Sequence, residues 1–153
     1  MGYQVRGLHF DDFEPGRVFF SASRTITEAD VVAFAGVSGD FNPLHTDETF
    51  AKTTPAGTRI AHGMLSVAIA TGLANQTGIF EGTTIALMQQ TIKYTGMVRF
   101  GDTIHLVLTV MDRKESRNPS RGVVTFRVEV LNQDDKPVVD SEWILMMARK
   151  VEG

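Results

Sequence analysis

The stretch SGDFNPLHTD, residues 38–47, carries side chains that could perform acid–base chemistry. Proline disfavours a helical conformation in the residue before it and is favoured at the first helical position, so Asn42 is predicted to cap a short turn beginning at Pro43. His45 then falls in the first turn, where the partial positive charge of a helix N-terminus disfavours an imidazolium ion. A neutral imidazole is the form that a general base needs. Asp40 lies five residues before His45, and we expect both side chains to face one pocket.

The same loop also has a structural interpretation. Aspartate and asparagine cap helices often, and an Asp–His pair in a loop is more often structural than catalytic. Taken alone, Asp40 and His45 therefore favour a structural role. Asp47 is better explained as the cap of a second short helix over residues 47–54 than as a catalyst.

A second segment, IAHGML, changes this balance because Gly63 stands at the predicted start of a buried helix. Free backbone N–H groups at such a start can bind an oxyanion or a carbonyl oxygen. An acid–base pair together with such a donor suits reactions next to a carbonyl group. The alternative is that Gly63 only eases packing where the helix meets the sheet. His62 is predicted to be structural, with a capping or packing role.

The remaining pattern predicts the elements that position these groups. Thr27 and Asp30 form a capping box for a short helix that Gly36 can end, and the long helix from Gly63 is apolar all round. Alternating apolar residues predict strands over 103–111 and 123–131, and further strands are predicted over 17–26, 83–94 and 137–148. One buried helix followed by an antiparallel meander indicates an α+β fold with the sheet wrapped around the helix.

Composition limits the class of protein. The 153 residues suit a single domain over residues 1–153, and the net charge of −3 argues against a nucleic-acid or membrane-surface binder. Cysteine is absent, which excludes disulfides, thiolate metal sites and cysteine nucleophiles. No apolar run reaches the length of a membrane span, and no secretory signal pattern opens the chain. We expect a cytoplasmic protein.

Three segments of the chain resemble one family. GDFNPLHTD, then HGML, and more weakly QTIKYTGMVRFGDTI resemble the hydratase-2 motif of MaoC-like, (R)-specific enoyl-CoA hydratases, over roughly residues 15–148. The resemblance implies a hot-dog fold, usually paired as a homodimer. It implies addition of water to a trans-2-enoyl-CoA to give the (R)-3-hydroxyacyl-CoA, or the reverse dehydration. Some relatives use acyl carrier protein in place of coenzyme A. No cofactor is implied beyond the thioester substrate.

The resemblance also implies roles for individual residues. Asp40 and His45 match the catalytic pair of the family, and Gly63 matches the residue whose N–H holds the thioester carbonyl. Thr71 stands where a pocket serine is common, and we place Asn42 with it in the substrate pocket. The alternative for Thr71 is a hydroxyl bonded back to its own helix. Which member of the pair protonates C2 stays open.

Three rival functions remain. A hot-dog thioesterase usually carries an acidic residue on the long helix, and residues 63–75 contain none. A metal hydrolase would need Asp40, His45, Asp47 and His62 as ligands, but their spacing matches no standard motif, so we expect no metal. A non-catalytic acyl-CoA binding module would not need the Asp40–His45 pair.

Overall fold

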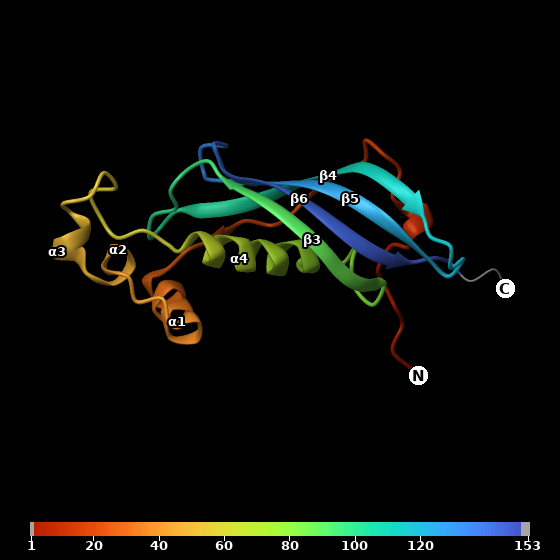
Figure 1. Ribbon diagram of the computed structural model, residues 1–153, viewed down its shortest axis with the longest axis horizontal. Helices are drawn as coiled ribbons and strands as arrows, with labels where there is room; N and C mark the ends of the chain where they lie inside the picture. Colours follow the sequence, from red (N-terminus) through yellow and green to blue (C-terminus); the bar gives the residue numbers. More distant parts are fainter. Residues whose placement is uncertain (1, 151–153) are drawn as a thin grey trace.

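The computed structural model describes residues 2–150, which form a curved antiparallel sheet packed on one long helix (Figure 1). Three short helices gather at one end of the long helix. The elements, in chain order, are η1 (Phe10–Asp12), β1 (Val18–Phe20), β2 (Arg24–Thr25), α1 (Glu28–Ser38), α2 (Pro43–Thr46), α3 (Glu48–Ala51), α4 (Gly63–Gln76), β3 (Thr84–Tyr94), β4 (Thr103–Glu115), β5 (Arg121–Leu131) and β6 (Pro137–Ala148).

All strand pairs of the described sheet are antiparallel. The strands lie in the order β1-β4-β5-β6-β3, and β2 also pairs with β4. The predicted α+β architecture is therefore confirmed. The inward faces of β4 and β5 are also as predicted, with buried Ile104, Leu106, Leu108, Val110, Val124, Phe126, Val128 and Val130. Within residues 2–150, none of the helices combines the length and apolar character that crossing a bilayer requires.

Two predicted strand bounds are wrong for identifiable reasons. The register of β4 against β5 shifts between Val110 and Asp112, and this bulge ends the alternating pattern although the strand continues to Glu115. The predicted strand 17–26 is split into β1 and β2. Between them, the hydroxyl of Ser21 accepts a hydrogen bond from the Leu106 N–H at 2.8 Å, which interrupts the regular backbone ladder.

The short helices follow their caps more closely. The capping box of Thr27 and Asp30 is present at the start of α1. The helix ends at Ser38 rather than near Gly36, because Gly39 adopts the left-handed conformation (φ 75°) that the C-cap requires. Asp47 caps α3 as predicted, accepting from the Phe50 N–H at 3.0 Å, but α3 is shorter than the predicted 47–54.

The long helix α4 buries one broad face against the sheet. Its buried residues are Leu65, Ser66, Val67, Ile69, Ala70, Leu73 and Ala74. The prediction that α4 is covered on most sides is only partly right, since Met64, Ala68, Thr71 and Gly72 are exposed in the single chain. The start of α4 faces the cluster of short helices, which brings the residue 38–47 segment to its N-terminus (Figure 1).

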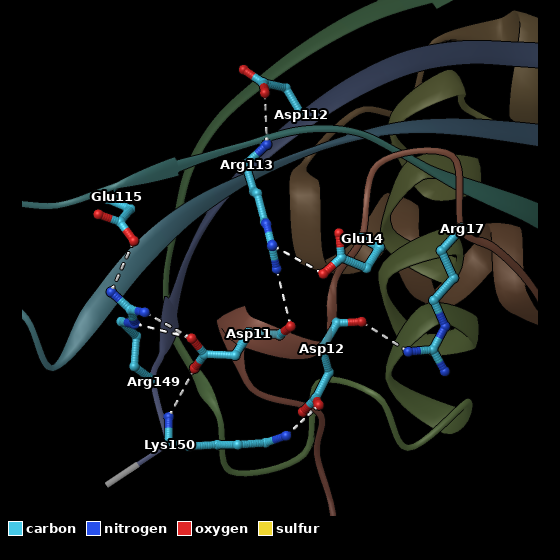
Figure 2. A network of polar contacts seen from close by, with 9 residues as sticks. All are labelled: Asp11, Asp12, Glu14, Arg17, Asp112, Arg113, Glu115, Arg149 and Lys150. Atoms are coloured by element: carbon cyan, nitrogen blue, oxygen red, sulfur yellow. Dashed lines mark hydrogen bonds and ion pairs between the residues drawn. The ribbon is translucent and has the colours of Figure 1, made fainter. Parts of the chain in front are cut away.

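Segments near the two ends of the described chain lie at the end of the fold away from α1, α2 and α3 (Figure 1), where polar contacts join them (Figure 2). Asp11 Oδ1 accepts from Arg149 Nη2 at 2.8 Å, and Asp11 Oδ2 accepts from the Lys150 N–H at 3.1 Å. Lys150 Nζ pairs with Asp12. The Arg149 guanidinium also lies 5.2 Å from the centre of the Phe10 ring. We call Asp11, Asp12, Arg149 and Lys150 the terminal clamp.

The terminal clamp makes the stability of the fold depend on pH in the acid range. Burial alone would raise the pKa of Asp11, but the Lys150 N–H and the Arg149 guanidinium outweigh it and hold that pKa below its ordinary value of 3.8. The hydrogen bond from Lys150 lowers the pKa of Asp12. A lowered folded-state pKa contributes stability above the ordinary value, and this stability is lost as the pH falls through the folded-state pKa.

We therefore expect Asp11→Asn to lower the free energy of unfolding near neutral pH by about 1 kcal/mol, the size of a partly exposed charged contact. The variant should also lose less stability than the wild type as the pH falls from about 4 towards about 2. Urea unfolding at several pH values measures both effects, and the exposed Asp134→Asn serves as the control. If the wild type and Asp11→Asn lost equal amounts of unfolding free energy as the pH falls, the prediction would be contradicted.

Candidate active site

The loop between α1 and α2 is held by its own side chains. The Asn42 side chain accepts from the Leu44 N–H at 3.0 Å, and Pro43 occupies the first turn, so the predicted cap is confirmed. The Asp40 carboxylate accepts from the Asn42 N–H at 3.1 Å. These local contacts fix the backbone that carries both Asp40 and His45.

His45 has one ring nitrogen engaged and one available. Its Nδ1 lies 2.7 Å from the carbonyl oxygen of Ile60. A carbonyl oxygen only accepts, so we assign the ring proton to Nδ1. In the neutral ring, Nε2 then carries a lone pair. This is the arrangement that a general base requires, with its orientation fixed from behind.

The structure brings Asp40 and His45 together with His62. One carboxylate oxygen of Asp40 and one ring nitrogen of each histidine lie within 4.8 Å of one another. A single water with hydrogen bonds of about 2.8 Å can bridge two acceptors at such a separation. His62 is only 2% exposed, and its ring stacks on that of His45 with centroids 3.8 Å apart and planes 28° apart.

The stacking also bears on metal binding. Imidazole nitrogens bind a metal in the plane of the ring, at about 2.0–2.1 Å for zinc. The rings of His45 and His62 are stacked rather than coplanar, with planes 28° apart. Among residues 2–150, Asp40, His45 and His62 are the candidate metal ligands.

The N-terminus of α4 lies beside this cluster. Gly63 opens the helix, and no residue of the described chain accepts a hydrogen bond from its N–H. The Tyr94 ring rests on Gly63 so closely that a Cβ there would lie 2.6 Å from Tyr94 Cε1. Tyr94 Oη also donates to Met64 Sδ at 3.2 Å. The glycine is thus required by a close packing contact, and its amide is free to donate.

A cavity of about 460 Å³ opens between α2, the start of α4 and the ends of β3 and β6, a size suited to a small-molecule ligand. His45 and Gly63 line it together, whereas Asp40 lies beside His45 without lining it. Most of the remaining wall is apolar, from Leu44, Ile60, Ala61, Met97, Val98, Val138 and Val139. An apolar cavity with one base and one free amide suits a largely apolar substrate that carries a carbonyl group.

Two predicted pocket residues do not line this cavity. The Asn42 side chain is engaged as the α2 cap. The Thr71 hydroxyl donates to the Ala68 carbonyl at 2.6 Å, which is the alternative that the sequence left open. Contact of either residue with substrate stays a prediction.

His62 and Tyr94 also contribute to the site, and the sequence predicted a role only for His62. His62 stands at the N-cap position of α4, but its side chain makes no capping hydrogen bond, so the capping role is wrong. The packing role is confirmed by burial and by the Phe34 ring at 5.0 Å. Tyr94 escaped notice because its contact with Gly63 joins positions far apart in the chain. The glycine at the first position of α4 was the signal that something approaches closely there.

The sheet, the long helix and the loop at its N-terminus define a hot-dog fold. A Mycobacterium tuberculosis protein with a double hotdog fold matches with a TM-score of 0.83 and 21% identity, over 99% of this chain and 47% of that chain.

The model of the MaoC like domain family matches residues 12–132, and the chain belongs to this family. A 3-hydroxybutyryl-CoA dehydratase from Methylorubrum extorquens is 32% identical, over 98% of this chain and 90% of the relative. An (R)-specific enoyl-CoA hydratase from Rhodospirillum rubrum is 34% identical, over 91% of each chain. The expected family is confirmed, and the chain is an enzyme of the hydro-lyase class.

Proposed function

We propose that this protein adds water to the trans-2-enoyl thioester of coenzyme A, giving the (R)-3-hydroxyacyl-CoA, or catalyses the reverse dehydration. The observation that carries the proposal is the approach of Asp40 and His45 to one another beside the free amide of Gly63. The relatives named as 3-hydroxybutyryl-CoA dehydratase and (R)-specific enoyl-CoA hydratase support the same chemistry.

The proposed mechanism follows from the atoms that are available. Asp40 and His45 Nε2 hold one water, and His45 takes a proton from it as its oxygen attacks C3 of the enoyl group. The Gly63 N–H donates to the thioester oxygen, which gains negative charge during the attack. The pair then returns one proton to C2. Because Asp40 and His45 interact closely, they act as one coupled acid–base unit.

Each of these groups is expected to contribute a rate enhancement of known order. General acid–base catalysis contributes about 10²–10⁴-fold, and one oxyanion donor about 10²–10³-fold. The donor acts without reorganisation because the start of α4 is fixed by packing against the sheet. Most of the cavity wall is apolar, and electrostatic interactions are stronger in such a medium than in water.

Incubation with crotonyl-CoA tests the proposal. Hydration removes the enoyl absorbance, and chiral analysis of the product should give the (R)-alcohol. Butyryl-CoA serves as the control, because release of free thiol from it would indicate a thioesterase. Binding of enoyl-CoA without turnover at any chain length would indicate a non-catalytic module. Activity that survives EDTA is expected, because no step requires a metal.

The carrier of the acyl group and its length are tested in the same assay. Crotonyl groups on coenzyme A and on acyl carrier protein are compared at equal concentration. We expect turnover of the coenzyme A thioester, because the relatives at 32% and 34% identity are named for coenzyme A substrates. A series of enoyl-CoA chain lengths then measures how much of the 460 Å³ cavity the acyl chain can use.

We propose that the active form is a homodimer paired across β3. This strand is at the edge of the sheet, and most of its residues on both faces are exposed in the single chain. Ile85, Leu87 and Met88 are each 46–53% exposed. An apolar edge strand of this length is a surface that a second copy can cover.

Leu87→Glu should therefore convert a dimer into a monomer, because a carboxylate would be buried against the partner copy. Sedimentation velocity measures the change. Val37→Glu is the matched control, since Val37 is 88% exposed on α1, away from β3. A wild-type protein that sediments as a stable, active monomer would refute the proposed dimer.

A further inference from the structure

His62 contacts both members of the proposed catalytic pair. Its Nε2 lies 2.9 Å from the backbone carbonyl oxygen of Asp40. Its ring stacks on the ring of His45 at 3.8 Å. The Phe34 ring is a further neighbour, with its centroid 5.0 Å from that of His62. His62 also directly precedes Gly63, so it lies where the loop, the base and the free amide meet.

We infer that His62 is a positioning residue, which fixes Asp40 and His45 relative to each other and to the start of α4. This inference rests on the proposed function, because it assigns His62 a part in the same reaction without contact to the reacting atoms.

The hydrogen bond determines the form of the His62 ring. The Asp40 carbonyl oxygen only accepts, so the proton of His62 lies on Nε2. Nδ1 is buried and has no hydrogen-bond partner among the described residues. A second proton on Nδ1 would be a buried donor without an acceptor, which is costly. The contacts of His62 therefore fit the neutral ring with its proton on Nε2.

The neutral form of His62 also suits its position against His45. When His45 accepts a proton, its ring becomes positive while it lies against the face of His62. A protonated His62 would place a second positive charge beside it, and the two cations would repel each other. The neutral ring of His62 adds no such repulsion.

The two contacts also couple parts of the chain that are distant in sequence. Asp40 and His45 belong to the loop around α2, and His62 belongs to the start of α4, where Gly63 offers its amide. Without His62, the loop could shift relative to that amide. Displacement of a reacting group by about 1 Å can cost about 10²-fold in rate.

Two substitutions separate the two contacts. His62→Gln keeps a side-chain donor for the Asp40 carbonyl but removes the aromatic face. His62→Phe keeps the face but removes the donor. We expect each to lower kcat for crotonyl-CoA by about 10–100-fold with KM changed less than about threefold, because geometry and not substrate affinity is lost.

Nuclear magnetic resonance provides a readout that does not need turnover. The chain has only 4 histidines, so the His45 ring signals can be assigned with a His45→Gln variant. A ring stacked at 3.8 Å should shift the His45 protons upfield. His62→Phe should keep this shift, and His62→Gln should lose it. If the wild type fails to hydrate any enoyl-CoA, the proposed function fails, and the shift still reports whether His62 positions His45.

Three results would overturn the inference. One is kcat within about threefold of wild type in both variants. Another is a His45 signal that does not change in His62→Gln. The third is that both variants lose the melting transition together with kcat and substrate affinity, which would indicate that His62 only supports packing.

Discussion

Asp40→Asn and His45→Gln are each expected to lower kcat for enoyl-CoA hydration by about 10²–10⁴-fold, the range of general acid–base catalysis. An amide keeps the size of each side chain but cannot take a proton from water at neutral pH. His45→Gln also removes the lone pair on Nε2, which the hydrogen bond to Ile60 leaves available. Stopped-flow or steady-state loss of the enoyl absorbance measures the effect.

The same loop provides a matched control. Asp47 follows His45 by two residues and caps α3 through the Phe50 N–H. Asp47→Asn should leave kcat within about threefold of the wild-type value. Asp47→Ala should lower the free energy of unfolding by about 1 kcal/mol, as expected for loss of a helix cap. Circular dichroism spectra of the Asp40 and His45 variants should remain native. Near-normal kcat in either of them would show that the loop only caps α2.

The double variant distinguishes a coupled pair from two independent groups. If Asp40 and His45 act on one water, substituting both should lower kcat little more than substituting one. Independent groups would multiply their effects. The placement of an Asp40 carboxylate oxygen within 4.8 Å of a His45 ring nitrogen favours the coupled result.

Local chemistry made the site partly predictable from the sequence. The Asn42 and Asp47 caps and the Thr27 capping box depend on residues within four positions, and all three are present. The proximity of Asp40 and His45 follows from the same short loop. The alternating strands also specified their inward faces, because a side-chain period of two leaves only one face for the apolar residues.

The features that could not be predicted from the sequence depend on contacts between positions that are distant in the chain. The stack of His62 on His45 and the approach of Tyr94 to Gly63 arise only when α4, the loop and β3 are placed together. The bulge after Val110 interrupts a periodic pattern without any residue that marks it. No local rule specifies these features, and two of them surround the proposed reaction centre.

The amide of Gly63 gives the second large effect, and proline at this position can remove it. Proline is favoured at the first position of a helix, and His62 already has φ −60° and ψ 138°, which suit a residue before proline. Gly63→Pro should therefore keep α4 intact while removing the N–H. Gly63→Ala keeps the N–H and is the matched control.

Both substitutions add a Cβ, which would meet Tyr94, so the comparison belongs in a Tyr94→Ala background. There, kcat of the Gly63→Pro protein should fall about 10²–10³-fold below that of the Gly63→Ala protein, because one oxyanion donor is lost. A loss confined to KM would instead indicate that the proline ring excludes substrate. Equal kcat and KM in the two proteins would mean that the glycine serves only the packing of Tyr94, and that the thioester oxygen is stabilised elsewhere.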